Sequence, residues 1–128
     1  MLDFNDVNVL GQILNDTFGM ASTTTNATSA IKASMSGHII SVMGIEIINL
    51  IDHRAATEES KKCADQLDQR IDAFIREVKK SFKEKSGKTL KCKLVKGSES
   101  TDVELINYSA YSPKRSAYVR RRMNFSCE

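Results

Sequence analysis

The chain has 128 residues, 41% hydrophobic and 27% charged, so it is long enough for one domain with a modest core. One Pro and six Gly argue against a disordered or collagen-like chain. The net charge of +3 is mild but uneven, because residues 1–51 carry four acids and one base, whereas residues 52–128 carry +6. This asymmetry indicates two faces with different neighbours.

Membrane insertion and secretion are not indicated. The first ten residues are acidic and lack the pattern of a secretory signal. The longest apolar run, residues 37–51, is too short to span a bilayer and contains Glu46. Cys63, Cys92 and Cys127 are widely spaced and no CxxC occurs, so we expect three reduced, mostly buried thiols rather than a zinc site or a disulfide framework.

The first predicted element is a helix over residues 3–18, with Asp3 and Asn5 as candidate caps and Gly19 as a candidate stop. Its apolar residues recur at spacings of three and four and form one stripe: Phe4, Val7, Leu10, Leu14 and Phe18. Residues 20–30 are rich in Ser and Thr. They predict a flexible loop, the start of an edge strand, or a segment that becomes ordered only against a partner.

Two strands are predicted next. Ile31, Ala33 and Met35 alternate with polar residues, which is typical of a strand with one buried face. Gly37 marks a hairpin turn or a bulge. Residues 38–50 are apolar on both faces and rich in β-branched side chains, which predicts a central strand that bends at Gly44.

The clearest pattern predicts a long helix over residues 55–86, with Gly87 as its stop. This helix is expected to lie across a sheet. Its predicted core stripe is Leu67, Ile71, Phe74, Ile75, Val78 and Phe82, extended backward by Cys63 or Ala64. Residues 88–127 then predict three strands joined as antiparallel hairpins. The sequence therefore predicts a single α+β domain over residues 1–128, ordered α-β-β-α-β-β-β, with two helices packed on an antiparallel sheet.

An arginine triplet lies in the last predicted strand. Period two places Arg120 and Arg122 on the polar face and Arg121 on the apolar face, where it needs a carboxylate or carbonyl partner such as Glu104. The polar face predicts either a solvated strand with edge-protecting charge, a nucleic-acid contact or a charged protein interface. The candidate contact residues are Tyr108, Tyr111, Lys114, Arg115, Tyr118, Arg120 and Arg122.

Catalytic and metal sites are not predicted. Asp65, Asp68 and Asp72 share one helical face, but without a histidine they favour a salt-bridged surface over a metal site. His38 and His53 lack a plausible nucleophile and orienting acid. No phosphate loop, nucleophile elbow, HExxH or dinucleotide fingerprint occurs, so we expect no enzyme, cofactor or small-molecule substrate.

The order of elements resembles that of small neck and tail-terminator proteins of tailed bacteriophages. The resemblance lies in a short helix, a long apolar strand (HIISVMGIEIINL), a long helix (CADQLDQRIDAFIREVKKSF) and a final strand (AYVRRRMNFSCE). It implies a virion structural protein, assembled in the host cytoplasm, that forms a homo-oligomeric ring or joins other virion proteins around a DNA-filled lumen. The alternative is a small nucleic-acid-binding module that uses the basic C-terminal hairpin.

Overall fold

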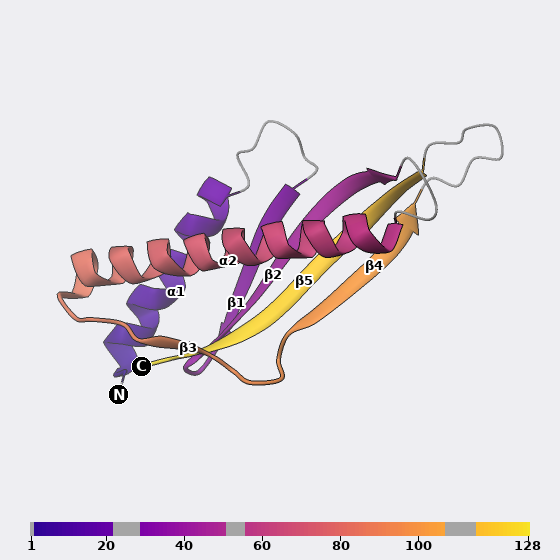
Figure 1. The fold of residues 1–128 in the computed structure, drawn as a ribbon. Helices are drawn as coiled ribbons and strands as arrows, with labels where there is room; N and C mark the ends of the chain where they lie inside the picture. Colours follow the sequence, from indigo (N-terminus) through magenta and orange to yellow (C-terminus); the bar gives the residue numbers. More distant parts are fainter. Residues whose placement is uncertain (1, 22–28, 51–55, 107–114) are drawn as a thin grey trace.

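The computed structural model describes residues 2–21, 29–50, 56–106 and 115–128, and their elements follow the predicted order α-β-β-α-β-β-β (Figure 1). The elements are α1 (Phe4–Ala21), β1 (Ser29–Ser36), β2 (Ile39–Leu50), α2 (Ala56–Ser86), β3 (Cys92–Leu94), β4 (Ser100–Ile106) and β5 (Arg115–Cys127). The predicted α+β class, with two helices and an antiparallel sheet, is confirmed. Of the Ser/Thr-rich segment predicted as a loop over residues 20–30, residues 20–21 belong to α1 and residues 29–30 to β1, and residues 22–28 lie outside the described residues. Among the described residues, no helix is long and apolar enough to cross a membrane.

The five-stranded sheet has β2 and β5 at its centre. β1 pairs with β2, β2 pairs with β5, and both β3 and β4 pair with the remaining edge of β5. The β1–β2 connection is a tight turn at Gly37, which has a φ of 59° that favours glycine. The predicted hairpin at this position is confirmed.

The prediction that residues 88–127 form successive hairpins is wrong for β3 and β4. Both run antiparallel to β5, so together they form one edge strand interrupted by residues 95–99. The interruption is held by backbone bonds: Val95 N donates to Asn124 O at 2.8 Å, and Ser98 N donates to Val95 O at 3.1 Å. Gly97 has a φ of 84°, so the chain turns tightly there and returns to the same side of β5.

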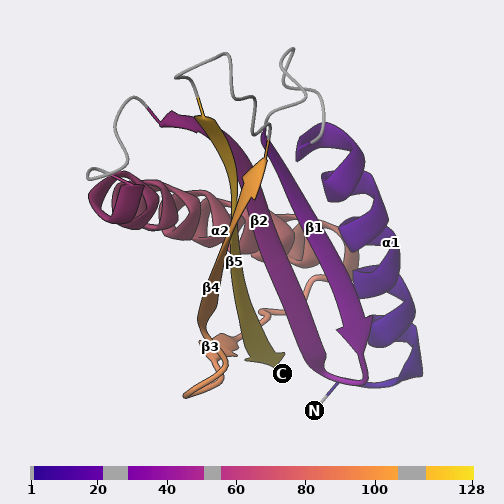
Figure 2. The same cartoon turned by 90° about the vertical axis from the view of Figure 1, so that its right-hand side faces the viewer.

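The long helix α2 lies diagonally across one face of the sheet, and α1 lies against β1 and α2 (Figures 1 and 2). All six residues of the predicted α2 stripe are buried, as are Cys63 and Ala64. The helix ends where predicted, because Gly87 adopts a φ of 73° and donates its N–H to Lys83 O at 2.9 Å. With eight of the twenty buried hydrophobic residues in the described ranges, α2 contributes more to the core than any other element.

The predicted stripe of α1 is only partly right. Leu10 and Leu14 are buried, but Phe4 is 80% exposed and Ile13, which the prediction omitted, is 1% exposed. The buried face is therefore set by contact with β1 and the C-terminal half of α2. The side chain of Phe18 lies outside the described residues, and the helix continues past Gly19 to Ala21.

The first turn of α1 is held by two aspartates. Asp6 N donates to Asp3 Oδ1 at 2.8 Å, and Asp3 N donates to Asp6 Oδ2 at 3.1 Å. This reciprocal arrangement satisfies two backbone donors, so Asp3 is the cap. Lys88 Nζ lies 2.9 Å from Asp6 Oδ2, and this bond, with the backbone bond at Asp3, holds the pKa of Asp6 below its usual range. The start of α1 is thereby tied to the segment after α2.

The expectation of three reduced thiols is wrong. Cys92 and Cys127 face each other across β3 and β5 and form a disulfide, which the sequence did not indicate because the two residues are 35 positions apart. Only the register brings them together, at a Cα–Cα distance of 4.1 Å. Cys63 is the one free thiol of the three. Burial, and then the nearby Glu46 carboxylate, raises the pKa of Cys63 to about 12, so this thiol stays protonated and unreactive.

Gly44 allows α2 to approach β2 closely. A Cβ at Gly44 would lie 3.1 Å from Leu67 Cδ2, 3.4 Å from Ile31 Cδ1 and 3.5 Å from Ile71 Cδ1. Gly44→Val therefore overpacks the core, and we expect it to lower the free energy of unfolding by about 1–3 kcal/mol. Denaturant titration measures this value.

The matched control is Gly11→Ala in α1. Its added Cβ would meet only Met35 Cε, at 3.8 Å, which is ordinary contact. Alanine favours a helix by about 1 kcal/mol over glycine, so this variant should be neutral or more stable. A Gly44→Val protein as stable as the native chain would contradict the close approach of α2.

Reduction of the disulfide is expected to lower the free energy of unfolding by roughly 2–4 kcal/mol, because the bond closes a long loop in the unfolded chain. Unfolding with and without a reductant measures the effect. Cys63→Ala should keep the full dependence on reductant, whereas Cys92→Ser should lose it. Thiol titration of the denatured, unreduced protein should find one reactive thiol, and three would refute the disulfide.

Candidate interaction surface: the open face of the sheet

Both helices pack on the same face of the sheet, and no helix of the described residues covers the other, here called the open face (Figure 2). Side chains alternate along a strand, so the residues between the core-facing positions point to this face. The open face comprises Lys32 and Ser34 of β1; Ser41, Met43, Ile45 and Ile47 of β2; Tyr118, Arg120, Arg122 and Asn124 of β5; and Asp102 and Glu104 of β4.

An apolar row runs along the centre of the open face. Met43, Ile45 and Ile47 are half-buried on β2, although no second layer covers them. Antiparallel sheets with one solvated face usually alternate apolar and polar residues, and β2 does not. The sequence pattern that predicted a central strand thus leaves apolar side chains of β2 without a covering layer.

The arginines that point to the open face are matched by carboxylates from β4. Arg120 Nη2 donates to Glu104 Oε2 at 2.8 Å, and the Arg120 guanidinium lies 5.5 Å from the centroid of the Tyr118 ring. Arg122 Nη2 lies 4.0 Å from Asp102 Oδ2. The positive charges of Arg120 and Arg122 on β5 are therefore largely neutralised by the carboxylates of Asp102 and Glu104 on β4.

Arg121 points to the helix side, as predicted, and is 16% exposed. Its Nε donates to Asp68 Oδ1 at 2.7 Å and its Nη2 donates to Glu99 Oε2 at 2.8 Å. Its Nη1 donates to Thr101 Oγ1 at 3.0 Å. The Asp68 carboxylate, aided by Glu99, raises the pKa of Arg121.

The predicted partner of Arg121, Glu104, is wrong. Glu104 is paired in register with Tyr118, so its side chain lies on the open face and meets Arg120 instead. The observed partner, Asp68, belongs to α2. It is too distant in sequence from Arg121 for the sequence pattern to predict the pair. Asp102 was not predicted as a partner and Glu104 was assigned to the wrong arginine, although their spacing of two residues places both on one face of a strand.

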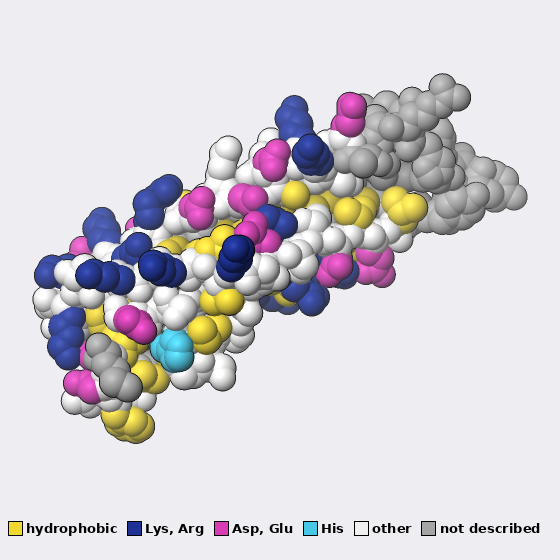
Figure 3. Space-filling model, turned by 60° about the horizontal axis from the view of Figure 1, so that its bottom comes forward, with side chains coloured by type: hydrophobic (Ala, Val, Ile, Leu, Met, Phe, Trp, Pro, Cys, Tyr) yellow, Lys and Arg dark blue, Asp and Glu magenta, His cyan; other side chains and the backbone are white. Residues whose placement is uncertain are grey.

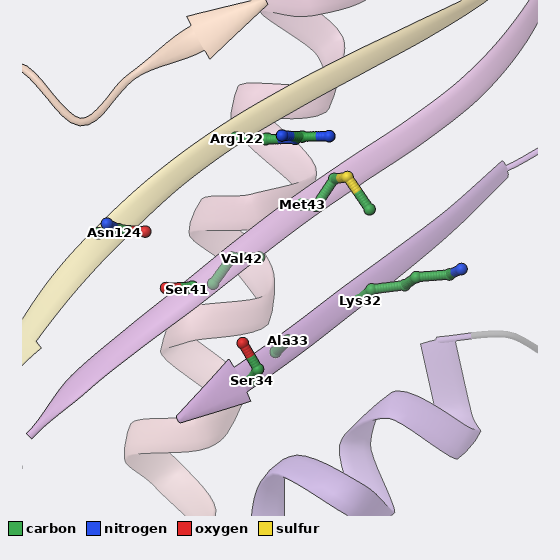
Figure 4. Close-up of a pocket in the computed structure, with 8 residues that line it drawn as sticks. All are labelled: Lys32, Ala33, Ser34, Ser41, Val42, Met43, Arg122 and Asn124. Carbon is green, nitrogen blue, oxygen red and sulfur yellow. The ribbon is translucent and has the colours of Figure 1, made fainter. Parts of the chain in front are cut away.

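A shallow hollow of about 370 Å³ lies on this face between β1, β2 and β5 (Figure 4). Arg122 extends from β5 toward β2, and Lys32 extends from β1 away from β2 (Figure 4). The Met43 side chain lies between them, and the hydroxyls of Ser34 and Ser41 and the amide of Asn124 lie further along the three strands (Figure 4). The hollow can therefore accept a polar or anionic group beside the apolar row.

Of the residues predicted to make contacts, three come together on the open face: Tyr118, Arg120 and Arg122. Arg115 is the first residue of β5, and its side chain lies outside the described residues. Tyr108, Tyr111 and Lys114 also lie outside the described residues.

The acidic set on α2 does not form a shared site. Asp68 pairs with Arg121, whereas Asp65 and Asp72 are exposed. In the described parts of the chain, no group of three or more His, Cys, Asp or Glu side chains is placed to hold a metal ion. His38 is exposed in the β1–β2 turn, and His53 lies outside the described residues.

Comparisons of the chain with protein-family models, curated proteins and solved structures find no match. Function must therefore be inferred from the surfaces themselves.

Arg121→Met is expected to lower the free energy of unfolding by about 2 kcal/mol, because it removes charge-assisted hydrogen bonds and leaves the half-buried Asp68 unpaired. Arg122→Met is the matched control. It removes the same group from an exposed site with a 4.0 Å pair, and should cost less than about 0.5 kcal/mol. Urea unfolding of both variants measures the difference, and equal losses would contradict the Asp68–Arg121 pair.

Proposed function

We propose that this protein is a structural assembly protein whose open face is a subunit interface. The proposal is supported by one observation above all: the central strand of an uncovered sheet face carries Met43, Ile45 and Ile47. Apolar side chains gathered on an open surface and bordered by polar ones are typical of interaction sites. Covering this row with another protein layer removes apolar surface from water.

A second copy of the chain is a suitable cover, because it presents the same apolar row, and because one side of the open face is basic while the other carries acids that already pair with arginines. Lys32 lies on β1 at one side, and Asp102 and Glu104 lie on β4 at the other. A two-fold axis parallel to the strands would lay β4 of one copy over β1 of the next. Acids would then meet a base, and the apolar rows would meet each other.

The resemblance to phage neck and tail-terminator proteins gives this assembly a biological setting. In that setting the chain is a virion structural protein, assembled in the host cytoplasm, that forms a ring or joins one with other virion proteins. The two-fold contact joins copies in pairs, so a ring requires a second, head-to-tail contact between the pairs or with other virion proteins. The proposed role is mechanical and needs neither a cofactor nor a small-molecule substrate. The order of the elements supports it.

Nucleic-acid binding through the basic C-terminal hairpin is less well supported. Arg120 pairs with Glu104, and Arg122 lies near Asp102, so this part of β5 presents little uncompensated positive charge. Phosphate contacts would have to displace these carboxylates.

The proposal predicts that the purified chain self-associates in a concentration-dependent way, and that Ile45→Glu abolishes this by placing a charge in the apolar row. Sedimentation velocity over a concentration series measures both. Ile45 is half-buried without a covering layer, so the monomer should keep its fold, which circular dichroism checks.

The matched control is Phe4→Glu, which removes an 80% exposed apolar side chain from α1, away from the sheet. It should self-associate like the native chain. A native chain that sediments as a monomer at every concentration contradicts autonomous assembly. An Ile45→Glu chain that still associates would place the interface elsewhere.

A further inference from the structure

A second surface of the molecule is strongly positively charged. Residues 79–96 contain eight lysines and a single glutamate, a net charge of +7, whereas the whole chain carries only +3. The other 110 residues therefore carry −4. These lysines belong to the last turns of α2, the connecting segment, β3 and the turn after it, here called the lysine-rich end. Lys and Arg side chains gather at this end of the molecule (Figure 3).

Some lysines of this segment have structural partners. Lys88 pairs with Asp6, Lys85 lies 3.6 Å from Asp16, and Lys83 donates to Gly87 O at 3.1 Å. The others have no ion pair among the described residues: Lys79, Lys80, Lys91, Lys93 and Lys96. This differs from the arginine triplet, where each member has a carboxylate within 4.0 Å.

Part of the lysine-rich end surrounds a hollow of about 450 Å³. Lys79 and Lys83 border it from successive turns of α2, and Thr89 and Lys91 border it from the connecting segment. Leu90 and Cys92 complete the lining, so the hollow has no carboxylate and no aromatic side chain.

The segment that carries these lysines is fixed to the rest of the fold. Leu90 is 3% exposed in the core, and Lys91 exchanges two backbone hydrogen bonds with Glu128, at 2.9 and 2.8 Å. The disulfide between Cys92 and Cys127 follows directly. The positive charges are therefore presented at set positions on a supported backbone rather than on a solvated tail, which favours a defined anionic ligand.

We propose that the lysine-rich end binds the phosphate backbone of duplex nucleic acid without reading its sequence. Lysine ammonium groups and a threonine hydroxyl are donors to phosphate oxygens. The lining has no aromatic side chain on which unpaired bases could stack, which favours a duplex over a single strand. A concave, lysine-bordered hollow fits a convex ridge of phosphates better than a flat membrane surface. This site is separate from the open face and does not depend on the proposed self-association.

The test compares two double variants that remove the same charge from α2 or its flanking segment. Lys79→Gln with Lys91→Gln changes the hollow, whereas Lys61→Gln with Lys62→Gln changes exposed lysines near the start of α2. Binding to a short duplex DNA of mixed sequence is measured by fluorescence anisotropy over a salt series. Lys83 is left intact because its ammonium group donates a hydrogen bond to Gly87 O at the end of α2.

We expect the native chain to bind the duplex at low salt and to release it as salt rises. Loss of two phosphate contacts should lower the slope of log affinity against log salt by about 1.8, and should weaken binding at low salt by about tenfold. The Lys61→Gln, Lys62→Gln chain should behave like the native chain. Thermal melting confirms that all three proteins are folded.

Three results would overturn the proposal. The first is no duplex binding at low salt. The second is an equal loss of affinity in both double variants, which would show attraction to net charge alone. The third is polyglutamate or anionic lipid vesicles competing as well as the duplex does, which would assign the surface to an acidic protein or to a membrane.

Discussion

The structure depends on the burial of one helical stripe of α2 against one face of the sheet. At Gly44 this contact is close, because side chains of Leu67 and Ile71 lie within 3.1 and 3.5 Å of where a Cβ would be. α2 lies diagonally across β2 and β5, and α1 packs beside it, against β1. Both helices then cover the same face, and the apolar row on the other face of β2 is left without a layer.

Period-two alternation divides the charges of the last strand between two environments. Arg121 lies beneath the edge of α2 and is held by Asp68 and Glu99, so its role is to join helix, sheet and the segment before β4. Arg120 and Arg122 meet the acids of β4 on the open face. Uncompensated positive charge is instead concentrated in residues 79–96, which lie at the other end of α2. The two surfaces therefore suit different partners: an apolar protein layer and a polyanion.

Patterns of apolar residues predicted the elements well where a single face is buried over many turns, as in α2, whose six predicted core positions are all buried. They were less successful for α1, where the exposed Phe4 and the buried Ile13 are decided by which face meets β1. Part of the candidate surface was also predictable. The division of the arginine triplet follows from alternation alone, whereas its carboxylate partners come from strands and a helix that are distant in sequence.

The sequence by itself determined the class of fold, the order of the elements, the buried stripe of α2 and the turn residues Gly37 and Gly87, because these follow from local periodicity and backbone conformation. Only the tertiary structure decided that β3 and β4 share one edge of β5. Only the tertiary structure places Cys92 beside Cys127 and pairs Arg121 with Asp68 rather than with Glu104. These outcomes depend on strand register and helix placement, which are set by the packing of the whole core and leave no mark in any short stretch of sequence.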